Sequence, residues 1–509
     1  MNNKKTLVNL VATMIAFFIN IFITFFLSPY IIKQIGVEAY GFFSLSNNFV
    51  MYFSVVTGSI NAIAGRYIVI ALHKKKIYEA NQYYTSMCFA NVILSLVLLV
   101  SIIIGVLNLE YFLTIPEDIL IDIKLLFFTV FLSFLLNMFS SILAVSYIVK
   151  NELYLSSLIQ IKGNLIRLIG LLALFYFYPP YVSYLGITSL ISTIFTRCYD
   201  LYYKKILVPM LNLKKEYVSL KKIKEMFSSG SWNMVLQLGA VLSGNIDLLV
   251  INLYLGATDM GILAIAKMLP IFLYNISSTM SGVFMPNFLE LYAKNKYDEL
   301  VSEVKKSLKL VFFIFSIPLA IFLVLGKEFF SLWVPNQNAE YIYILSILST
   351  VSVIIIGPIM SIVYNIFTVV NKLKINALLV LITGAINTVI CLLILNYTSM
   401  GLLVIVSVTS ALSLIRNLLY NVPYGAIYLK SKWHTFFPII IKATLGMLLI
   451  FTVGYKFKQL FNIDSWINFI CIAIFIAMVD IFIQLSLILS KDERFILLNK
   501  IKTKIGKKI

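Results

Sequence analysis

The run LVNLVATMIAFFINIFITFFLSPYII, residues 7–32, carries no charged side chain. About 20 apolar residues are enough for a helix to cross a bilayer, so this run can do so. It is too long for the apolar core of a signal peptide, and no small-residue cleavage site follows it. We therefore expect a retained first membrane-spanning helix directly after the short basic start Met-Asn-Asn-Lys-Lys.

The rest of the chain has the same character. Of its 509 residues, 61% are hydrophobic and 12% are charged, whereas soluble proteins carry about 25% charged residues. We expect an all-α polytopic membrane protein with about 14 transmembrane helices. The expected spans are 7–32, 40–65, 83–107, 124–149, 154–177, 182–203, 227–253, 262–289, 309–331, 341–369, 375–396, 402–424, 438–456 and 466–489.

Basic residues gather in alternate loops between these spans. If the N-terminus is cytoplasmic, most of the 41 Lys and Arg residues fall in cytoplasmic segments. The outer loops then hold Lys33, Lys327, Lys456 and Lys458. This asymmetry follows the positive-inside rule and predicts that both termini are cytoplasmic. It also accounts for the net charge of +19 without a nucleic-acid partner.

Two glycine turns recur 220 residues apart. Gly36-Val37-Glu38-Ala39-Tyr40-Gly41 follows the first expected helix, and Gly256-Ala257-Thr258-Asp259-Met260-Gly261 follows the seventh. Parallel six-helix repeats with a substrate site between the halves are a known transporter plan, although two short turns can also match by chance. The expected division is two pseudo-symmetric six-helix lobes, 1–203 and 227–429, a basic cytoplasmic linker, 204–226, and helices 13 and 14 with a basic cytoplasmic tail, 430–509.

Arginine is rare in this chain and sits where burial is costly. Its five arginines are Arg66, Arg167, Arg197, Arg416 and Arg494, and the first four lie in or at the ends of expected spans. A guanidinium can hold a phosphate or carboxylate through two parallel hydrogen bonds, which lysine cannot do. A charge inside the bilayer costs several kcal/mol, so these arginines are candidates for a functional site.

Embedded bases outnumber embedded acids. Asp247 and Asp480 are the acids placed clearly within spans. A structural network of ion pairs would need equal numbers of the two signs, because an unpaired buried charge is so unfavourable. The surplus predicts a cavity that receives an anion, with Arg66, Lys162, Arg167, Arg197 and Arg416 as the substrate-binding residues.

Several of the embedded bases also have a purely structural alternative. Arg167 could pair with a carbonyl or a carboxylate, and Arg197 has Asp200 one helical turn away as a ready partner. Lys162 and Lys442 could extend to the membrane interface instead. Asp247 and Lys267 lie at matched depth in adjacent helices, where they form either a salt bridge or a gate or ion-coupling site.

The sequence has no motif of enzyme chemistry. We find no Walker A motif, zinc-ligand spacing, nucleophile elbow or paired catalytic acids. The four cysteines show no paired spacing, so no disulfide framework, metal site or cofactor is expected. Energy would have to come from an ion gradient or from downhill use of the substrate.

Several short segments resemble bacterial polysaccharide flippases of the multidrug/oligosaccharidyl-lipid/polysaccharide exporter superfamily. They are Leu7-Val8-Asn9-Leu10, Ser28-Pro29-Tyr30-Ile31-Ile32, Gly36-Val37-Glu38-Ala39-Tyr40-Gly41 and Asn61-Ala62-Ile63-Ala64-Gly65-Arg66-Tyr67. The resemblance in motifs is confined mainly to the first 75 residues, while the helix plan covers the whole chain.

The resemblance implies a pair of six-helix lobes in the bacterial cytoplasmic membrane. It also implies transfer of an undecaprenyl-pyrophosphate-linked oligosaccharide from the inner to the outer leaflet by alternating access, with H⁺ or Na⁺ as possible coupling ions. We expect the protein to work as a monomer among membrane lipids. Alternatives with the same fold are a drug exporter or a peptidoglycan-precursor exporter. The alternative of another class is a membrane-embedded glycan polymerase or ligase.

Overall fold

The computed structural model describes residues 3–398 and 400–488, and this part of the chain contains no β-strand. The tail 489–509, which includes Arg494 and which we expected to be cytoplasmic, lies outside the described residues. The α-helices are α1 (Asn3–His73), α2 (Ile77–Leu107), α3 (Leu120–Ser140), α4 (Val145–Lys150), α5 (Leu153–Phe177), α6 (Ser183–Leu207), α7 (Leu220–Ala240), α8 (Asp247–Tyr254), α9 (Ala257–Gly282), α10 (Met285–Ala293), α11 (Tyr297–Trp333), α12 (Ala339–Val369), α13 (Leu373–Tyr397), α14 (Leu402–Arg416), α15 (Val422–Tyr428), α16 (Phe437–Lys458) and α17 (Trp466–Leu487).

The expected all-α membrane fold is confirmed. Among the described residues, 10 helices are long and apolar enough to cross a membrane, or up to 11 if the bent pair α7 and α8 forms one span. Helix α1 counts once here although it covers two expected spans. The number fourteen therefore stays a prediction. Most described residues of the expected spans are helical, with breaks at Ile246 and at residues 283–284.

Glycines mark the ends of two expected spans. Gly36 interrupts α1 with φ 85° and ψ 169°, and Gly256 lies just before α9 with φ 96°. A positive φ is strained for residues with a Cβ atom, so glycine is the natural residue at both turns. The two turns of the sequence echo thus share a backbone feature, and the repeat of whole lobes remains a prediction.

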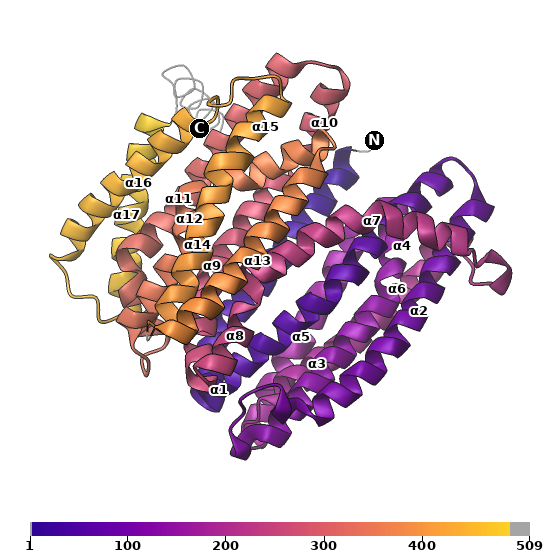
Figure 1. Cartoon of the computed structure of the whole chain (residues 1–509), viewed down its shortest axis with the longest axis horizontal. Coiled ribbons are helices and arrows are strands. Elements are labelled where there is room, and N and C mark those ends of the chain that lie inside the picture. The colour runs from indigo at the N-terminus through magenta and orange to yellow at the C-terminus, as the bar shows by residue number, and fades with distance from the viewer. Residues whose placement is uncertain (1–2, 399, 489–509) are drawn as a thin grey trace, which may run out of the picture. The chain divides into compact units, whose positions relative to one another are not determined.

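The described chain divides into two compact units, Met1–Ala264 and Ile265–Ile509. In the first unit, α3 packs on α6, α6 on α5, and α5 on α1, while α7 packs against α1 and α2. Figure 1 shows α2, α3 and α6 running side by side in this unit. Since α7 packs on helices that precede it, it belongs to this unit by its contacts, whereas the expected lobes 1–203 and 227–429 stay a prediction.

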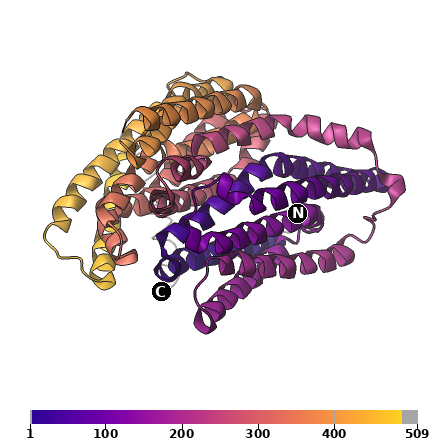
Figure 2. The same cartoon turned by 60° about the horizontal axis from the view of Figure 1, so that its bottom comes forward.

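In the second unit, α11 is the central helix. It packs against α12, α16 and α17, and α14 packs against α12 and α13. The last two helices form a hairpin at the C-terminal end of the described chain (Figure 2). The Ser465 hydroxyl caps the start of α17 by accepting a hydrogen bond from the Asn468 amide at 3.3 Å, which satisfies one of the free amide groups of that end.

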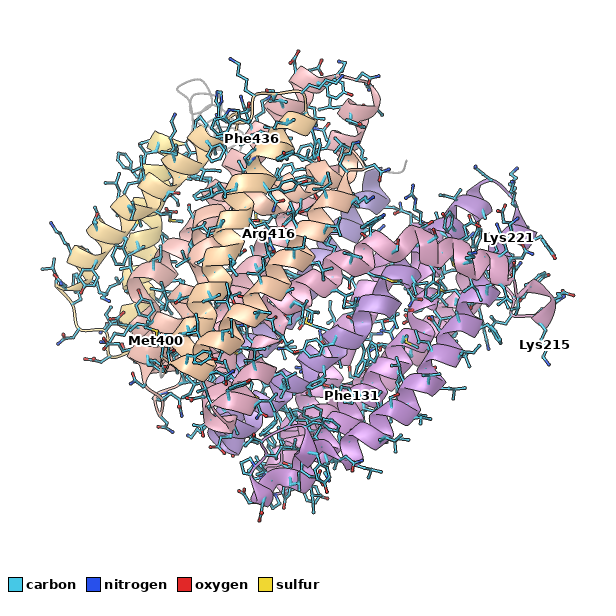
Figure 3. All side chains as sticks on the ribbon, in the orientation of Figure 1. Phe131, Lys215, Lys221, Met400, Arg416 and Phe436 are labelled. Atoms are coloured by element: carbon cyan, nitrogen blue, oxygen red, sulfur yellow. The ribbon has the colours of Figure 1, made fainter. Side chains whose placement is uncertain are left out.

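The segment between α6 and α7 is held on α2 by side chains. The Asn81 side chain accepts from the Asn212 amide at 2.7 Å and donates to the Met210 carbonyl at 3.1 Å. The Ser86 hydroxyl accepts from the Ser219 amide at 2.9 Å. Figure 3 labels Lys215 and Lys221 near one another at this end of the unit. These bonds fix the segment that the sequence predicted to be a basic linker.

The two echoed turns touch within the first unit. A Cβ atom on Gly41 would lie 2.8 Å from the Gly261 Cα, and one on Gly261 would collide with the Val37 carbonyl oxygen. Beside this crossing, the Thr258 hydroxyl donates to the Glu38 carboxylate at 2.5 Å. Glycine at both positions therefore permits a backbone approach that any side chain would block.

Replacing Gly261 by alanine should destabilise the protein by about 1–3 kcal/mol, because the new methyl group meets backbone rather than a side chain that can move. The melting temperature of the purified protein in detergent measures this. Gly105→Ala is the matched control, since a Cβ at Gly105 meets nothing within 4 Å. Equal melting temperatures for the two variants would contradict the proposed close packing.

Candidate anion site and buried charges

Arg167 lies in α5, where that helix packs on α1 and α6, and is half-buried. One turn earlier, the Ser192 hydroxyl of α6 donates to the Gly163 carbonyl at 2.8 Å, and a Cβ on Gly163 would lie 2.7 Å from the Thr196 methyl group. This close contact fixes the part of α5 that carries Arg167.

Within the described part of the chain, the Arg167 guanidinium forms no hydrogen bond or ion pair. The phenol of Tyr40 on α1 lies near this guanidinium. Structural pairing with a carboxylate, the alternative left open by the sequence, is therefore not seen among these residues. A half-buried guanidinium without an acidic partner retains its capacity to bind an anion.

Arg197 has a different environment. Its Nη1 lies 2.5 Å from Asp200 Oδ2, and the buried Tyr147 hydroxyl donates to Asp200 Oδ1 at 2.7 Å. The structural pairing expected from their spacing is thus present. Arg197 Nε is buried and has no partner among the described residues, so the pair leaves part of the guanidinium unused.

The two remaining candidate substrate-binding bases of the first unit, Lys162 and Arg66, are exposed. Lys162 Nζ lies 5.6 Å from the ring centroid of Tyr199, which follows Arg197 by two residues on α6. Lys162 and Arg197 are therefore carried by the packed pair α5 and α6. Arg66 is exposed on α1, at the end of the span that the loop charges predict to be cytoplasmic. None of these arrangements tests the predicted role of the five bases in substrate binding.

Arg416 is the candidate base in the second unit. It is half-buried, and its Nη1 donates to the Thr383 hydroxyl of α13 at 2.9 Å. Its Nε is buried without a partner, and no described acid pairs with it. Figure 3 shows Arg416 between the labelled Met400 and Phe436, away from both ends of this unit.

A π-helical turn, Asn417–Asn421, directly follows Arg416. Such turns are rare and are often found at functional sites. The Asn421 amide donates to the Asn417 side chain at 2.8 Å, and both side chains are buried. Sequence reasoning missed this turn and the Thr383 partner, because both depend on local hydrogen bonding rather than on the pattern of apolar residues.

The predicted gate residues belong to different units. Asp247 is buried and begins α8 after a second π-helical turn, Val241–Asn245. Tyr52 and Asn48 of α1 donate to the Asn245 carbonyl at 2.6 and 2.8 Å, which holds this turn in place. Lys267 is half-buried on α9. Whether these two residues form a gate or ion-coupling site remains a prediction.

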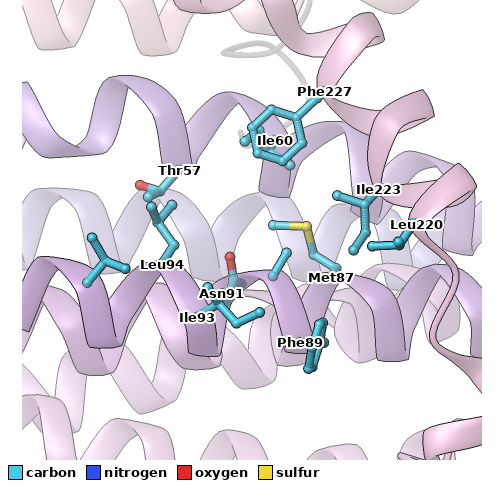
Figure 4. Close-up of a pocket in the computed structure, with 12 residues that line it drawn as sticks. Thr57, Ile60, Met87, Phe89, Asn91, Ile93, Leu94, Leu220, Ile223 and Phe227 are labelled. Atoms are coloured by element: carbon cyan, nitrogen blue, oxygen red, sulfur yellow. The ribbon is translucent and has the colours of Figure 1, made fainter.

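An apolar pocket lies between α1, α2 and α7 (Figure 4). Its volume is about 280 Å³, and its lining includes Ile60, Met87, Leu94, Ile223 and Phe227. The Asn91 amide at its wall already donates to Asn61 at 3.0 Å and to the Met138 carbonyl at 3.1 Å. This pocket contains none of the predicted bases, so it is distinct from the candidate anion site.

The corner between α4 and α5 is tied to the start of α1. Asn9 donates to the Asn151 carbonyl at 3.0 Å and accepts from the Tyr154 amide at 3.0 Å. Nearby, Lys5 Nζ lies 2.8 Å from Glu152, and this ammonium holds the pKa of the Glu152 carboxyl below its usual value. These contacts set the position of α5, and with it Lys162 and Arg167, against α1.

The described residues contain no group of three or more His, Cys, Asp and Glu side chains that could hold a metal ion. The candidate arginines and Lys162 can bind an anion through their guanidinium and ammonium donors.

A family model described as "Polysaccharide biosynthesis protein" matches residues 4–292. The chain is similar to the "Uncharacterized membrane protein EpsK" of Bacillus subtilis (strain 168), with 28% identity over 503 residues and 99% of each chain covered. Its fold is similar to that of "Lipid II flippase MurJ, inward closed conformation", with a TM-score of 0.66, 15% identity, and 94% of this chain and 99% of that chain covered.

A second solved structure with a similar fold is the "Inward-facing conformation of a multidrug resistance MATE family transporter of the MOP superfamily". The TM-score is 0.61 at 11% identity, and the match covers 84% of this chain and 94% of that chain. At such low identities the likeness establishes a shared fold. Our chain therefore has the fold of these transporters.

Replacing Glu152 by glutamine should lower stability near neutral pH and have little effect in acid. The folded pKa of Glu152 is depressed, so its contribution is present above the unfolded pKa and is lost as pH falls through the folded value. Because the pair is partly exposed, we expect at most about 1 kcal/mol. Melting temperatures of both proteins from pH 7 down to about pH 4 measure the difference. A gap that stays constant over this range would contradict the account.

Proposed function

Because this chain belongs to the polysaccharide biosynthesis protein family, we propose that it is a flippase for an undecaprenyl-pyrophosphate-linked oligosaccharide. It moves this lipid from the cytoplasmic to the outer leaflet of the bacterial cytoplasmic membrane, by alternating access through a cationic cavity. Both termini are cytoplasmic, and the protein works as a monomer.

The observation that supports this most is the state of Arg167. It is a half-buried guanidinium in an apolar helix and has no acidic partner among the described residues. Leaving such a charge unpaired is unfavourable unless water or a bound anion compensates it. A diphosphate has the negative charge and the acceptor oxygens that a guanidinium binds with two parallel hydrogen bonds.

Arg416 adds a second, similar group. One of its nitrogens is bound to a neutral hydroxyl and another is buried without a partner. Lys162, Arg197 and Arg66 would supply further positive charge along the path of the diphosphate. The sugars would cross in the polar interior, while the polyprenyl tail stays among the membrane lipids. H⁺ or Na⁺ would drive the cycle, with Asp247 and Lys267 as the gate or ion-coupling pair.

Three alternatives are distinct from this proposal. A peptidoglycan-precursor exporter is compatible with the fold, since a lipid II flippase shares it. A drug exporter for cationic compounds fits less well, because embedded acids would serve it better than embedded bases. A glycan polymerase or ligase is disfavoured, since the fold is that of transporters. Rescue of strains that lack each kind of exporter distinguishes the first two from the proposed flippase.

Replacing Arg167 by alanine should reduce glycan export more than replacing it by lysine. The lysine keeps the charge but loses the paired hydrogen bonds. A charge-assisted contact contributes about 1.5–3 kcal/mol, which corresponds to roughly a tenfold to hundredfold loss of affinity. The measurement is surface glycan in a flippase-deletion strain that carries each variant at equal membrane abundance.

The matched control is Lys442→Ala, because Lys442 is an exposed base within a spanning helix. It should export normally. Full export by Arg167→Ala would remove this residue from the mechanism. Full export by the double variant Arg167→Ala, Arg416→Ala would contradict the cationic path as a whole.

A further inference from the structure

A further buried acidic group lies in the C-terminal helices, within the second unit. Asp480 of α17 is fully buried, with 0% of its surface exposed. Its position is 14 residues after the start of the helix at Trp466, or about 21 Å along the axis. That distance places the carboxyl group deep inside an apolar span.

Two helices, α11 and α17, meet at this carboxyl group, and α16 contacts the neighbouring Gln484. Ser316 of α11 lies 2.7 Å from Asp480 Oδ2, and Gln484 of α17 lies beside Asp480 one turn further on. Gln484 packs against the backbone of α16 at Gly446, where an added Cβ would be 2.8 Å from its Oε1. Ser316, Asp480 and Gln484 each have 0% of their surface exposed.

Several polar atoms of Asp480 and Gln484 form no hydrogen bond among the described residues. Asp480 Oδ1 and both amide atoms of Gln484 are buried and have no hydrogen-bond partner among the described residues. No described base pairs with Asp480. Two bases lie on the neighbouring helices near this group. Lys309 is seven residues before Ser316 on α11, and Lys442 is one turn before Gly446 on α16. Lys442 is exposed, and no ion pair joins either base to Asp480.

The two contacts of the Ser316 hydroxyl favour a neutral Asp480. The Ser316 Oγ atom lies 2.9 Å from the Phe313 carbonyl and 2.7 Å from Asp480 Oδ2. A hydroxyl has one hydrogen to donate. If Asp480 is ionised, the two acceptors compete for that hydrogen. If Asp480 is protonated, its O–H donates to Ser316 Oγ, and Ser316 donates to Phe313, so both contacts of Ser316 are satisfied.

We propose that Asp480, Ser316 and Gln484 form an intramembrane proton-binding site, in which Asp480 is a neutral carboxylic acid at neutral pH. Exchange of this proton with water leaves a carboxylate and turns the Ser316 hydroxyl toward it. A carboxylate without a positive partner is unfavourable in lipid, so release of the proton loosens the packing of α17 on α11. This step couples proton movement to transport, a part of the inference that rests on the proposed function.

Infrared difference spectroscopy of the purified protein tests the site without any substrate. A proton-bound Asp480 gives a protonated-carboxyl band at neutral pH that is lost in Asp480→Asn. The matched control is Asp464→Asn, which alters an exposed loop acid and should leave the band unchanged. Absence of the band at neutral pH would overturn the proposal. A band that disappears on addition of Na⁺ would also overturn it, since the site would then hold a metal cation.

Export in the complemented strain tests the coupling. Asp480→Asn keeps the shape of the neutral acid but cannot exchange a proton, so we expect export to be lost at normal membrane abundance. Full export by Asp480→Asn together with failure of Arg167→Ala would reject the coupling alone. Full export by both variants would instead indicate that the proposed function is wrong. The infrared result is independent of either outcome.

Discussion

The cost of a charge without a counter-charge inside the membrane is the constraint on which this structure depends. The chain is 61% hydrophobic, and its spanning helices offer few groups that can neutralise a guanidinium or a carboxylate. Each embedded charge must find a partner, reach water, lose its charge or bind a ligand. The described residues show several of these solutions, and function follows from which solution each residue adopts.

Arg197 and Arg167 show the contrast within one pair of packed helices. Arg197 is compensated by Asp200, which Tyr147 holds in turn. Arg167 has no such acid and sits in the middle of α5. Arg197 therefore has at least a partly structural role, whereas Arg167 is available to bind an anion. Asp480 is the opposite case, an acid without a base, for which taking up a proton is the simplest compensation.

Much of the fold could be predicted from sequence because the apolar runs are long and the loops are short. The glycine echo was also informative, since Gly36 and Gly256 share a positive φ and Gly41 meets Gly261. Other features could not be predicted. The π-helical turn after Arg416, the Thr383 contact and the Ser316–Asp480 contact depend on which helix faces lie together, and one apolar pattern permits several such arrangements. The packing of α7 on α1 and α2 also could not be predicted, and the expected lobes stay a prediction.

Binding of a polyprenyl diphosphate to the purified protein tests the central claim most directly. The protein in nanodiscs is titrated with polyprenyl diphosphate and, separately, with the matching polyprenyl alcohol. We expect the diphosphate to bind more tightly, and we expect the Arg167→Ala, Arg416→Ala variant to reduce this preference by roughly tenfold or more. Equal affinity of the intact protein for the two lipids, or an unchanged preference in the double variant, would contradict it.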